Sequence, residues 1–365
     1  MDYDPARLWA GGSDGYAIRA HHRSLDVVAV GERSSHSRTE CANSEILPAC
    51  VDQRFDDFDA QSEQLVGHDQ EYVQMSPGAF RGRFVSAFLG GGISLHLETA
   101  NRALEQRVGC PDGMISLGLV VGKSPSFRAN GVELGRDRLL ITNPGCELSL
   151  NSPAGGKILA ICIEQWALDR AAAGGELPQP LDPSVGRIAV LQAPVLAARL
   201  RGASIDLLRA IRARAGHAVR RNVARPLAAA IEAEFALHDA VLDEWPSGSR
   251  SGDYRTFMKA KDIMATGAMT EFDYARLSEA TSRSVRSIQS AFLKHAGTTP
   301  LRYFRAVKLT EARRALLSFR KGQKTVGDIA AECGFWSHSR FAQLYKLQFG
   351  ELPSQTMYRK APEPA

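Results

Sequence analysis

The last hundred residues of this 365-residue chain carry the same local pattern twice, and this repeat constrains the fold more than any other feature. In each copy, a short stretch of helix-spaced apolar residues ends at a bend, and a second amphipathic stretch follows directly. The copies span 274–294 and 326–348. Two short helices joined by a tight bend form a helix-turn-helix unit. The repeat therefore predicts an all-α C-terminal domain that contains two such units.

The first copy has a recognisable bend and cap between its two helices. Ser282 and Arg283 form the bend, and Ser284 is placed to cap the second helix, because a serine side chain accepts a hydrogen bond from a free backbone N–H group. The outward face of this second helix could reach base edges in a major groove of DNA. The candidates for base contacts on this face are Arg286, Ser287, Gln289 and Ser290.

The second copy repeats this plan. Thr325 and Asp328 have the spacing of a capping box, and Gly334 supplies the left-handed residue that stops the first helix. The base-contact candidates on the next helix are His338, Ser339, Arg340 and Gln343. The alternative is that both copies are ordinary amphipathic helices in an all-α domain. It is disfavoured because the bend, the small residue and the aromatic residue recur at matching offsets.

A single helix is expected to join the two units. Thr299 is placed as its N-cap, and Pro300 occupies its first position. A rigid helix here would let the two recognition helices enter successive major-groove segments about 34 Å apart. Basic side chains in and near this helix are candidates for phosphate contacts, with a merely solvated basic face as the alternative. These candidates are Lys294, Arg305 and Lys308.

Charge is distributed unevenly along the chain. Residues 254–360 contain 19 Lys and Arg against 8 Asp and Glu, a net charge of +11, whereas the other residues contain 26 against 32, a net charge of −6. A concentrated positive charge favours double-stranded DNA as the partner, because neutralised phosphates release counterions. A membrane partner is disfavoured, since no apolar run approaches the roughly 18 residues needed to span a bilayer. The N-terminus lacks a secretion signal, so we expect a cytoplasmic, nucleoid-associated protein.

The N-terminal half has the pattern of a small β-structure. Short alternating runs are separated by turns that contain Gly, Pro or Asn, which indicates a barrel or a jelly roll. The strongest hairpin signal is Asn130-Gly131, because both residues tolerate a positive φ. The predicted strands are 84–85, 93–97, 115–121, 139–141, 148–150 and 158–163.

No catalytic constellation accompanies these strands. A metal-dependent barrel enzyme needs converging histidines and a carboxylate, yet residues 80–163 contain only His96. We interpret His96 as a solvent-facing strand residue or a satisfied core histidine. The six cysteines lack C-x-x-C spacing and favour reduced structural thiols, with redox sensing as the alternative. The sequence therefore predicts no enzyme activity, no metal site and no cofactor.

These signals predict an α+β multidomain chain. Residues 1–40 are expected to be a disordered tail, followed by the β-domain at 41–193. A helical segment at 194–243 either forms a dimer seam or packs on the β-domain. A Pro/Gly/Ser-rich linker at 244–253 then precedes the DNA-binding domain at 254–360.

Residues 255–358 resemble the DNA-binding domain of AraC/XylS-type transcriptional regulators. The likeness is carried by 284–292, 309–317, 326–335 and 349–354. It implies base contacts from both second helices, at Arg286, Gln289, Ser290, His338, Ser339 and Gln343. Two of these, Ser290 and Gln343, stand where arginine is common, and Ser282 stands where the family usually has glycine.

Three further segments look like the branch of that family that contains the ethanolamine operon regulator: 80–84, 334–336 and 341–345. The family resemblance also implies that the N-terminal β-domain is a cupin-like sensory barrel. It does not identify an effector.

Together these observations predict a sequence-specific, effector-responsive transcriptional regulator, with activation as the expected outcome. Its predicted partners are a double-stranded DNA operator, a small-molecule effector, RNA polymerase if it activates, and a second copy of itself in a homodimer. One alternative is a constitutive dimeric regulator without a ligand. The other is a β-barrel metabolite-binding protein or enzyme with an appended helical domain.

Overall fold

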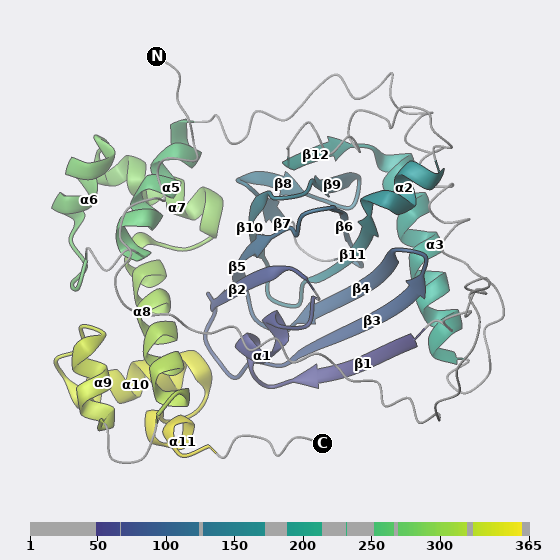
Figure 1. Ribbon diagram of the computed structural model, residues 1–365. Helices are drawn as coiled ribbons and strands as arrows, with labels where there is room; N and C mark the ends of the chain where they lie inside the picture. Colours follow the sequence, from purple (N-terminus) through teal and green to yellow (C-terminus); the bar gives the residue numbers. More distant parts are fainter. Residues whose placement is uncertain are drawn as a thin grey trace, which may run out of the picture. The chain divides into compact units, whose positions relative to one another are not determined.

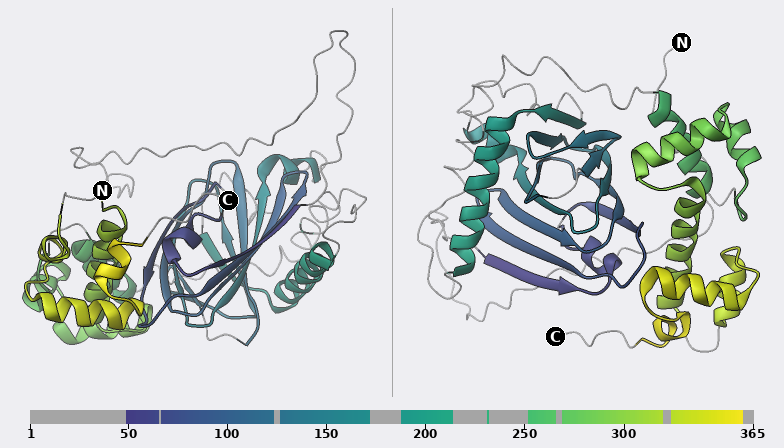
Figure 2. Two further views of the ribbon diagram at one scale, coloured as in Figure 1. Left: turned by 90° about the horizontal axis from the view of Figure 1, so that it is seen from below. Right: turned by 180° about the vertical axis from the view of Figure 1, so that it is seen from behind.

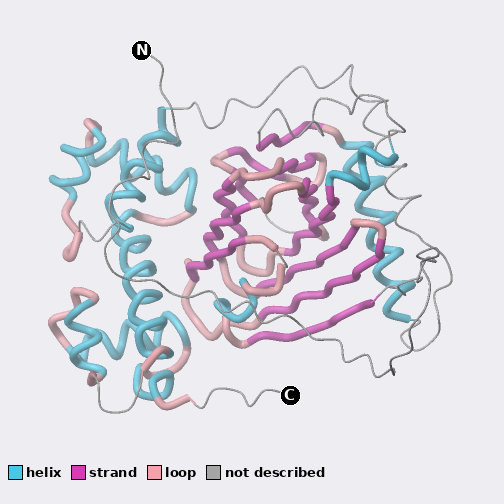
Figure 3. Tube along the Cα trace, in the orientation of Figure 1, coloured by secondary structure: helices cyan, strands magenta, loops and turns pink. Residues whose placement is uncertain are grey.

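The computed structural model describes a β-rich region followed by a helical region (Figures 1 and 3). The described residues are 49–65, 67–123, 127–171, 188–213, 231, 252–265, 269–319 and 324–359. The predicted tail at 1–40, most of the segment 214–243 and nearly all of the predicted linker lie outside them.

The described strands form two antiparallel sheets. One has seven strands in the order β1-β3-β4-β11-β6-β9-β12, and the other has five in the order β2-β5-β10-β7-β8. The strands are β1 (Ala49–Phe55), β2 (Asp69–Gln74), β3 (Gly82–Gly90), β4 (Ile93–Ala100), β5 (Leu104–Gly109), β6 (Met114–Val120), β7 (Phe127–Ala129), β8 (Val132–Leu134), β9 (Arg138–Thr142), β10 (Glu147–Ser152), β11 (Lys157–Glu164) and β12 (Ile188–Gln192).

The two sheets do not close into the cupin-like barrel that we predicted. Among the strands that the structure describes, β1 pairs with β3 alone and β12 with β9 alone, and the five-stranded sheet likewise ends at β2 and β8. A barrel requires every strand to have two hydrogen-bonded neighbours. The correct description is therefore a β-rich domain of two open sheets. The coarser prediction, a β-rich region before a helical one, is confirmed.

Alternating residues of the seven-stranded sheet belong to two hydrophobic clusters, one on each face of the sheet. On β11, Ile161 belongs to a cluster on the helix-covered face, whereas Ile158 packs with Phe127 and Leu150 of the other sheet. Successive strand residues point to opposite faces, so this alternation buries both sides of the sheet. A space between the two sheets is thus lined by both of them.

Helix α3 (Pro194–Ala213) packs on the seven-stranded sheet, as Figure 2 shows. Its apolar stripe, which includes Leu196, Leu200 and Leu208, is buried in the same cluster as Ile161. The sequence leaves open whether segment 194–243 forms a dimer seam or packs on the β-domain. In the described part of that segment, the apolar stripe of α3 packs on the β-domain.

The helical region forms two apolar clusters that share one long helix, α8 (Pro300–Leu317). The first cluster surrounds Phe257, Phe292 and Tyr303, and the second surrounds Phe341 and Tyr345. The other helices are α1 (Phe58–Ser62) and α2 (Gln165–Ala171) in the β-domain, and α5 (Gly252–Ala265), α6 (Tyr274–Thr281), α7 (Val285–Ala296), α9 (Val326–Glu332), α10 (His338–Phe349) and α11 (Pro353–Met357). None of the helices described here is long and apolar enough to cross a membrane.

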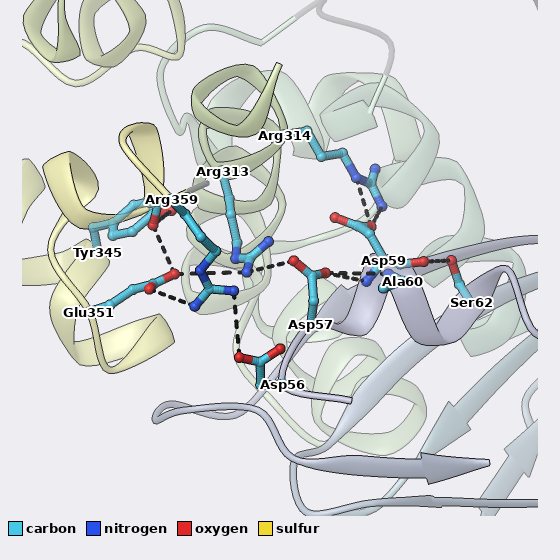
Figure 4. A network of polar contacts seen from close by, with 11 residues as sticks. Asp56, Asp57, Asp59, Ala60, Ser62, Arg313, Arg314, Tyr345, Glu351 and Arg359 are labelled. Carbon is cyan, nitrogen blue, oxygen red and sulfur yellow. Dashed lines mark hydrogen bonds and ion pairs between the residues drawn. The ribbon is translucent and has the colours of Figure 1, made fainter. Parts of the chain in front are cut away.

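A network of charged side chains joins α8 to the segment around α1 (Figure 4). Arg313 contacts Asp57 at 2.9 Å, and Arg314 contacts Asp59 at 2.8 Å. The Arg313 guanidinium also lies over the rings of Phe58 and Phe349, 5.2 and 5.6 Å from their centroids. Because its side chain is only 3% exposed, Arg313 is a buried charge that depends on these partners.

Candidate nucleic-acid interface

Helices α6 and α7 form a pair around a tight bend, as predicted. Ser282 adopts the left-handed conformation, with φ 53°, and ends α6. Ser284 caps α7, and its side-chain oxygen accepts a hydrogen bond from the Ser287 backbone N–H at 3.2 Å. The predicted cap is therefore confirmed, and the local sequence fixes the angle at which α7 begins.

Helix α7 separates a buried face from a polar one. Ile288 and Phe292 are fully buried, whereas Arg286, Ser287 and Ser290 are exposed. Gln289 is half-buried, and its side-chain amide donates to the Tyr274 hydroxyl at 3.2 Å. The first set of base-contact candidates thus lies on the solvent side of α7, except that Gln289 already has a partner on α6.

Helices α9 and α10 form the second pair. Thr325 and Asp328 make the predicted capping box, with reciprocal side-chain to backbone hydrogen bonds. Gly334 has φ 85°, and a Cβ atom there would collide with the Thr270 carbonyl oxygen. Glycine is therefore required at this turn both by its backbone conformation and by the close approach of another segment.

The second set of base-contact candidates is also exposed. Ser337 caps α10. Phe341 and Tyr345 bury the opposite side of the helix. The exposed candidates are His338, Ser339, Arg340 and Gln343. Two capped helices on one domain therefore present two polar, solvent-facing surfaces.

The three phosphate candidates lie in different environments. Lys294 is half-exposed and forms an ion pair with Asp253 at 2.9 Å. Arg305 is half-buried and lines a hollow of about 460 Å³ between the two helix pairs. Lys308 is only 7% exposed, and its Nζ contacts Glu311 at 2.8 Å. Burial and this partner make Lys308 less accessible to a phosphate than Lys294 or Arg305.

Sequence reasoning overlooked one exposed aromatic side chain at this surface. Trp336 is 73% exposed and lies two residues before His338, at the entry to α10. Its indole N–H donates to Glu271 at 2.8 Å. The sequence places this tryptophan directly before the capping serine, but only the folded structure shows that it is exposed.

The β-domain contains a separate cavity between its two sheets. His96 is buried and lines this cavity. Its two ring nitrogens contact the hydroxyl groups of Ser86, at 3.0 Å, and Ser94, at 2.8 Å. Burial lowers the pKa of His96 to about 4. It is therefore the satisfied core histidine of the two alternatives, and it is neutral near pH 7.

Metal and redox chemistry find little support in the described residues. In them, no group of three or more His, Cys, Asp or Glu side chains could hold a metal ion. Burial raises the pKa of Cys110 to about 11 and that of Cys333 to about 11. A raised pKa suppresses the thiolate, which is the reactive form, so these two thiols favour the structural interpretation over redox sensing.

Comparison with known proteins relates the helical region to DNA-binding regulators. Residues 277–359 match the family model of a helix-turn-helix domain. XylDLEGF operon transcriptional activator 1 of Pseudomonas putida is 42% identical over 85 residues, which cover 23% of this chain and 26% of that protein. The probable thc operon regulatory protein of Rhodococcus erythropolis is 34% identical over 98 residues, which cover 27% of this chain and 30% of that protein. The matches thus span about a quarter to a third of these relatives.

A solved structure extends over more of the chain with a weaker likeness. The AraC-like transcriptional activator CuxR covers 78% of this chain and 100% of its own, at 13% identity and a TM-score of 0.38. The sequence matches show a helix-turn-helix domain at residues 277–359 and relate this part of the chain to transcriptional activators. Nothing in them identifies the ethanolamine-related branch.

Proposed function

We propose that this chain is an AraC/XylS-type transcriptional regulator that reads two successive major-groove segments of its operator with α7 and α10. The observation that carries the proposal is the pair of capped helices at each end of α8, within the region that matches the helix-turn-helix domain. The net charge of +11 on residues 254–360 supplies the general attraction to phosphate. Lys294 and Arg305 are the proposed phosphate contacts.

We further propose that the protein is an activator that responds to a small molecule bound in the β-domain cavity. The relatives named above include activators, and activation would require contact with RNA polymerase. The proposal also includes a homodimer, a cytoplasmic and nucleoid-associated location, no enzyme activity, and kinship with the ethanolamine-related branch. A constitutive dimeric regulator is the second candidate, and unchanged operator affinity across a metabolite panel would favour it.

The direct test compares specific with general DNA binding. Genome-wide mapping of bound sites supplies the operator, and anisotropy titrations at moderate salt then compare it with a scrambled duplex. Arg286→Ala and His338→Ala should each weaken operator binding by about 1–3 kcal/mol, roughly 5- to 150-fold, if their side chains contact bases. Binding to the scrambled duplex should change much less.

Arg209→Ala is the matched control, because Arg209 lies on α3, has a side chain that is 74% exposed and forms only an exposed ion pair with Asp206. It should leave both titrations unchanged. Equal losses on operator and scrambled DNA would show that α7 and α10 do not read sequence. A wild-type chain that prefers no mapped fragment over its scrambled version would overturn the proposed function itself.

A further inference from the structure

The cavity between the two sheets has an apolar wall and one polar end. Its volume is about 70 Å³. Both sheets contribute apolar side chains to the wall, among them Phe84, Val108, Leu140, Leu148 and Ile158. Dry apolar cavities of about 150 Å³ accept a molecule the size of benzene. This cavity is about half that size, so it suits a compact molecule with fewer non-hydrogen atoms than benzene, on the order of four or five.

The polar end is formed around a buried carboxylate. Glu98 on β4 lines the cavity and is only 8% exposed. It accepts hydrogen bonds from the side-chain amides of Gln61, at 2.8 Å, and Gln106, at 3.2 Å, and it also interacts with the Tyr72 hydroxyl. Every one of these donors is a neutral group.

In the described part of the chain, no lysine or arginine forms an ion pair with Glu98. Two histidines line the same cavity: the lowered pKa of His96 makes it neutral near pH 7, and the ring of His68 contacts the Ser116 hydroxyl at 2.9 Å. A buried carboxylate is rarely stable as an ion unless a positive charge accompanies it. The hydrogen-bond donors around Glu98 are thus neutral, and a cationic ligand in the cavity would compensate the charge of Glu98 when this group is ionised.

We propose that this cavity binds a small organic cation, an alkylammonium with a compact branched hydrocarbon body, whose N–H group contacts Glu98. The hydrocarbon part would fill the apolar wall, and the ammonium group would supply the missing positive charge. Charge-assisted hydrogen bonds of this kind are about twice as strong as neutral ones. This inference rests on the proposed function only in taking the cavity as the effector site.

The test measures binding to the full chain without DNA, with three probes of matched shape: isobutylamine, isobutanol and isobutyrate. A ligand that binds only the folded state raises Tm, because it stabilises that state by RT ln(1 + [L]/Kd). Isobutylamine should raise Tm at millimolar concentration, isobutanol should raise it less, and isobutyrate should have no effect. Calorimetric titration should show at least tenfold weaker binding of isobutanol than of the amine.

Glu98→Gln keeps the size of the side chain and removes its charge, so it should weaken isobutylamine binding at least tenfold. Glu63→Gln is the control, because Glu63 is an exposed glutamate at the end of α1. It should bind the amine as the wild type does. Ala160→Leu, which fills the cavity from β11, should abolish binding of all three probes and serves if Glu98→Gln does not fold.

Three results would each overturn the inference. Glu98→Gln could leave amine binding unchanged, or isobutyrate could bind at least as tightly as the amine. The third such result is that the wild type does not respond to the amine. The proposed function is judged separately by the DNA titrations. If the amine binds and operator affinity stays constant, the cavity assignment holds and the effector response fails.

Discussion

At the scale of single residues, Ser282 is held in an unfavourable backbone conformation. It ends α6 with φ 53°, and its backbone N–H donates to the Ser278 and Glu279 carbonyls. An L-residue in the left-handed region is less stable than glycine there by roughly 1–2 kcal/mol. The AraC/XylS-type pattern that this region resembles has glycine at this position. The positive φ of Ser282 explains this preference, because glycine adopts a positive φ without strain.

Ser282→Gly should therefore stabilise the helical region, by about 0.5–1 kcal/mol after the extra chain entropy of glycine is subtracted. Urea unfolding followed by circular dichroism measures this change. Ser282→Ala is the comparison, because alanine keeps the Cβ atom and removes the hydroxyl. A glycine variant no more stable than the alanine variant would mean that Ser282 is not strained.

Glu98 makes a second residue-scale prediction, on the dependence of stability on pH. Burial raises the pKa of Glu98 above its ordinary value of 4.5. A carboxyl group with a raised folded-state pKa stabilises the fold below the unfolded-state pKa, and this contribution is lost as pH rises through the folded-state value. The unliganded wild type should therefore lose stability relative to Glu98→Gln as pH rises above about 4.5.

The measurement is the difference in unfolding free energy between the two proteins at several values from about pH 4 to about pH 8, a range that spans the titration of a carboxyl with a raised pKa. Tyr72, His68 and His96 lie near Glu98, but they are present in both proteins, so their titration largely cancels in the difference. A difference that does not vary with pH would show that Glu98 has the same pKa in the folded and unfolded chains.

At the scale of elements, the sequence predicted those strands and turns whose signals are local. β4, β6 and β11 alternate apolar residues, and all were expected. β2 and β5 were missed because their sequences read as polar, and the burial of Glu105 on β5 depends on Lys261 of α5, with which it forms an ion pair. A local pattern cannot show that a distant lysine will neutralise a buried glutamate.

The Asn130-Gly131 hairpin was predicted correctly. It also has a second role, in packing, which the sequence did not indicate. Its two residues have φ 46° and 78° and join β7 to β8. Gly131 also lies directly against the ring of Tyr254 on α5, where a Cβ atom would collide. This turn therefore needs glycine both for its own conformation and for the packing of α5.

Gly131→Ala should destabilise the protein by clearly more than the roughly 1 kcal/mol expected from the backbone conformation alone. Gly155→Ala isolates the backbone effect, because Gly155 has φ 75° and a Cβ atom added there would meet no other group within 4 Å. Chemical denaturation of both variants gives the comparison. Equal losses would mean that the Tyr254 contact contributes nothing to stability.

At the scale of the whole molecule, contacts between residues far apart in the sequence could not be predicted from the sequence. The base-contact candidates followed from helical periodicity and caps, because recognition faces are properties of single helices. The contact of Arg313 with Asp57 joins residues 256 positions apart, and a helical pattern only marks Arg313 as one more basic residue on α8. Only the assembled structure shows that it is buried between two aromatic rings.

This burial makes Asp57 important for stability. Asp57→Asn should cost about 3 kcal/mol, the lower end of the range for breaking a buried ion pair, because Glu351 remains 3.8 Å from Arg313. The substitution is selective, since asparagine caps a helix as well as aspartate does and α1 keeps its cap. Equilibrium unfolding of the full chain gives the free energy.

Asp56→Asn provides the matched control at the adjacent position. Asp56 has a side chain that is 81% exposed and lies 3.8 Å from Arg359, and exposed pairs of this kind contribute little. Its loss should leave the unfolding free energy unchanged within error. If Asp57→Asn behaves like Asp56→Asn, then the rings of Phe58 and Phe349 and the Glu351 carboxylate are enough to hold the Arg313 charge, and the ion pair with Asp57 is not what stabilises the packing of α8 against α1.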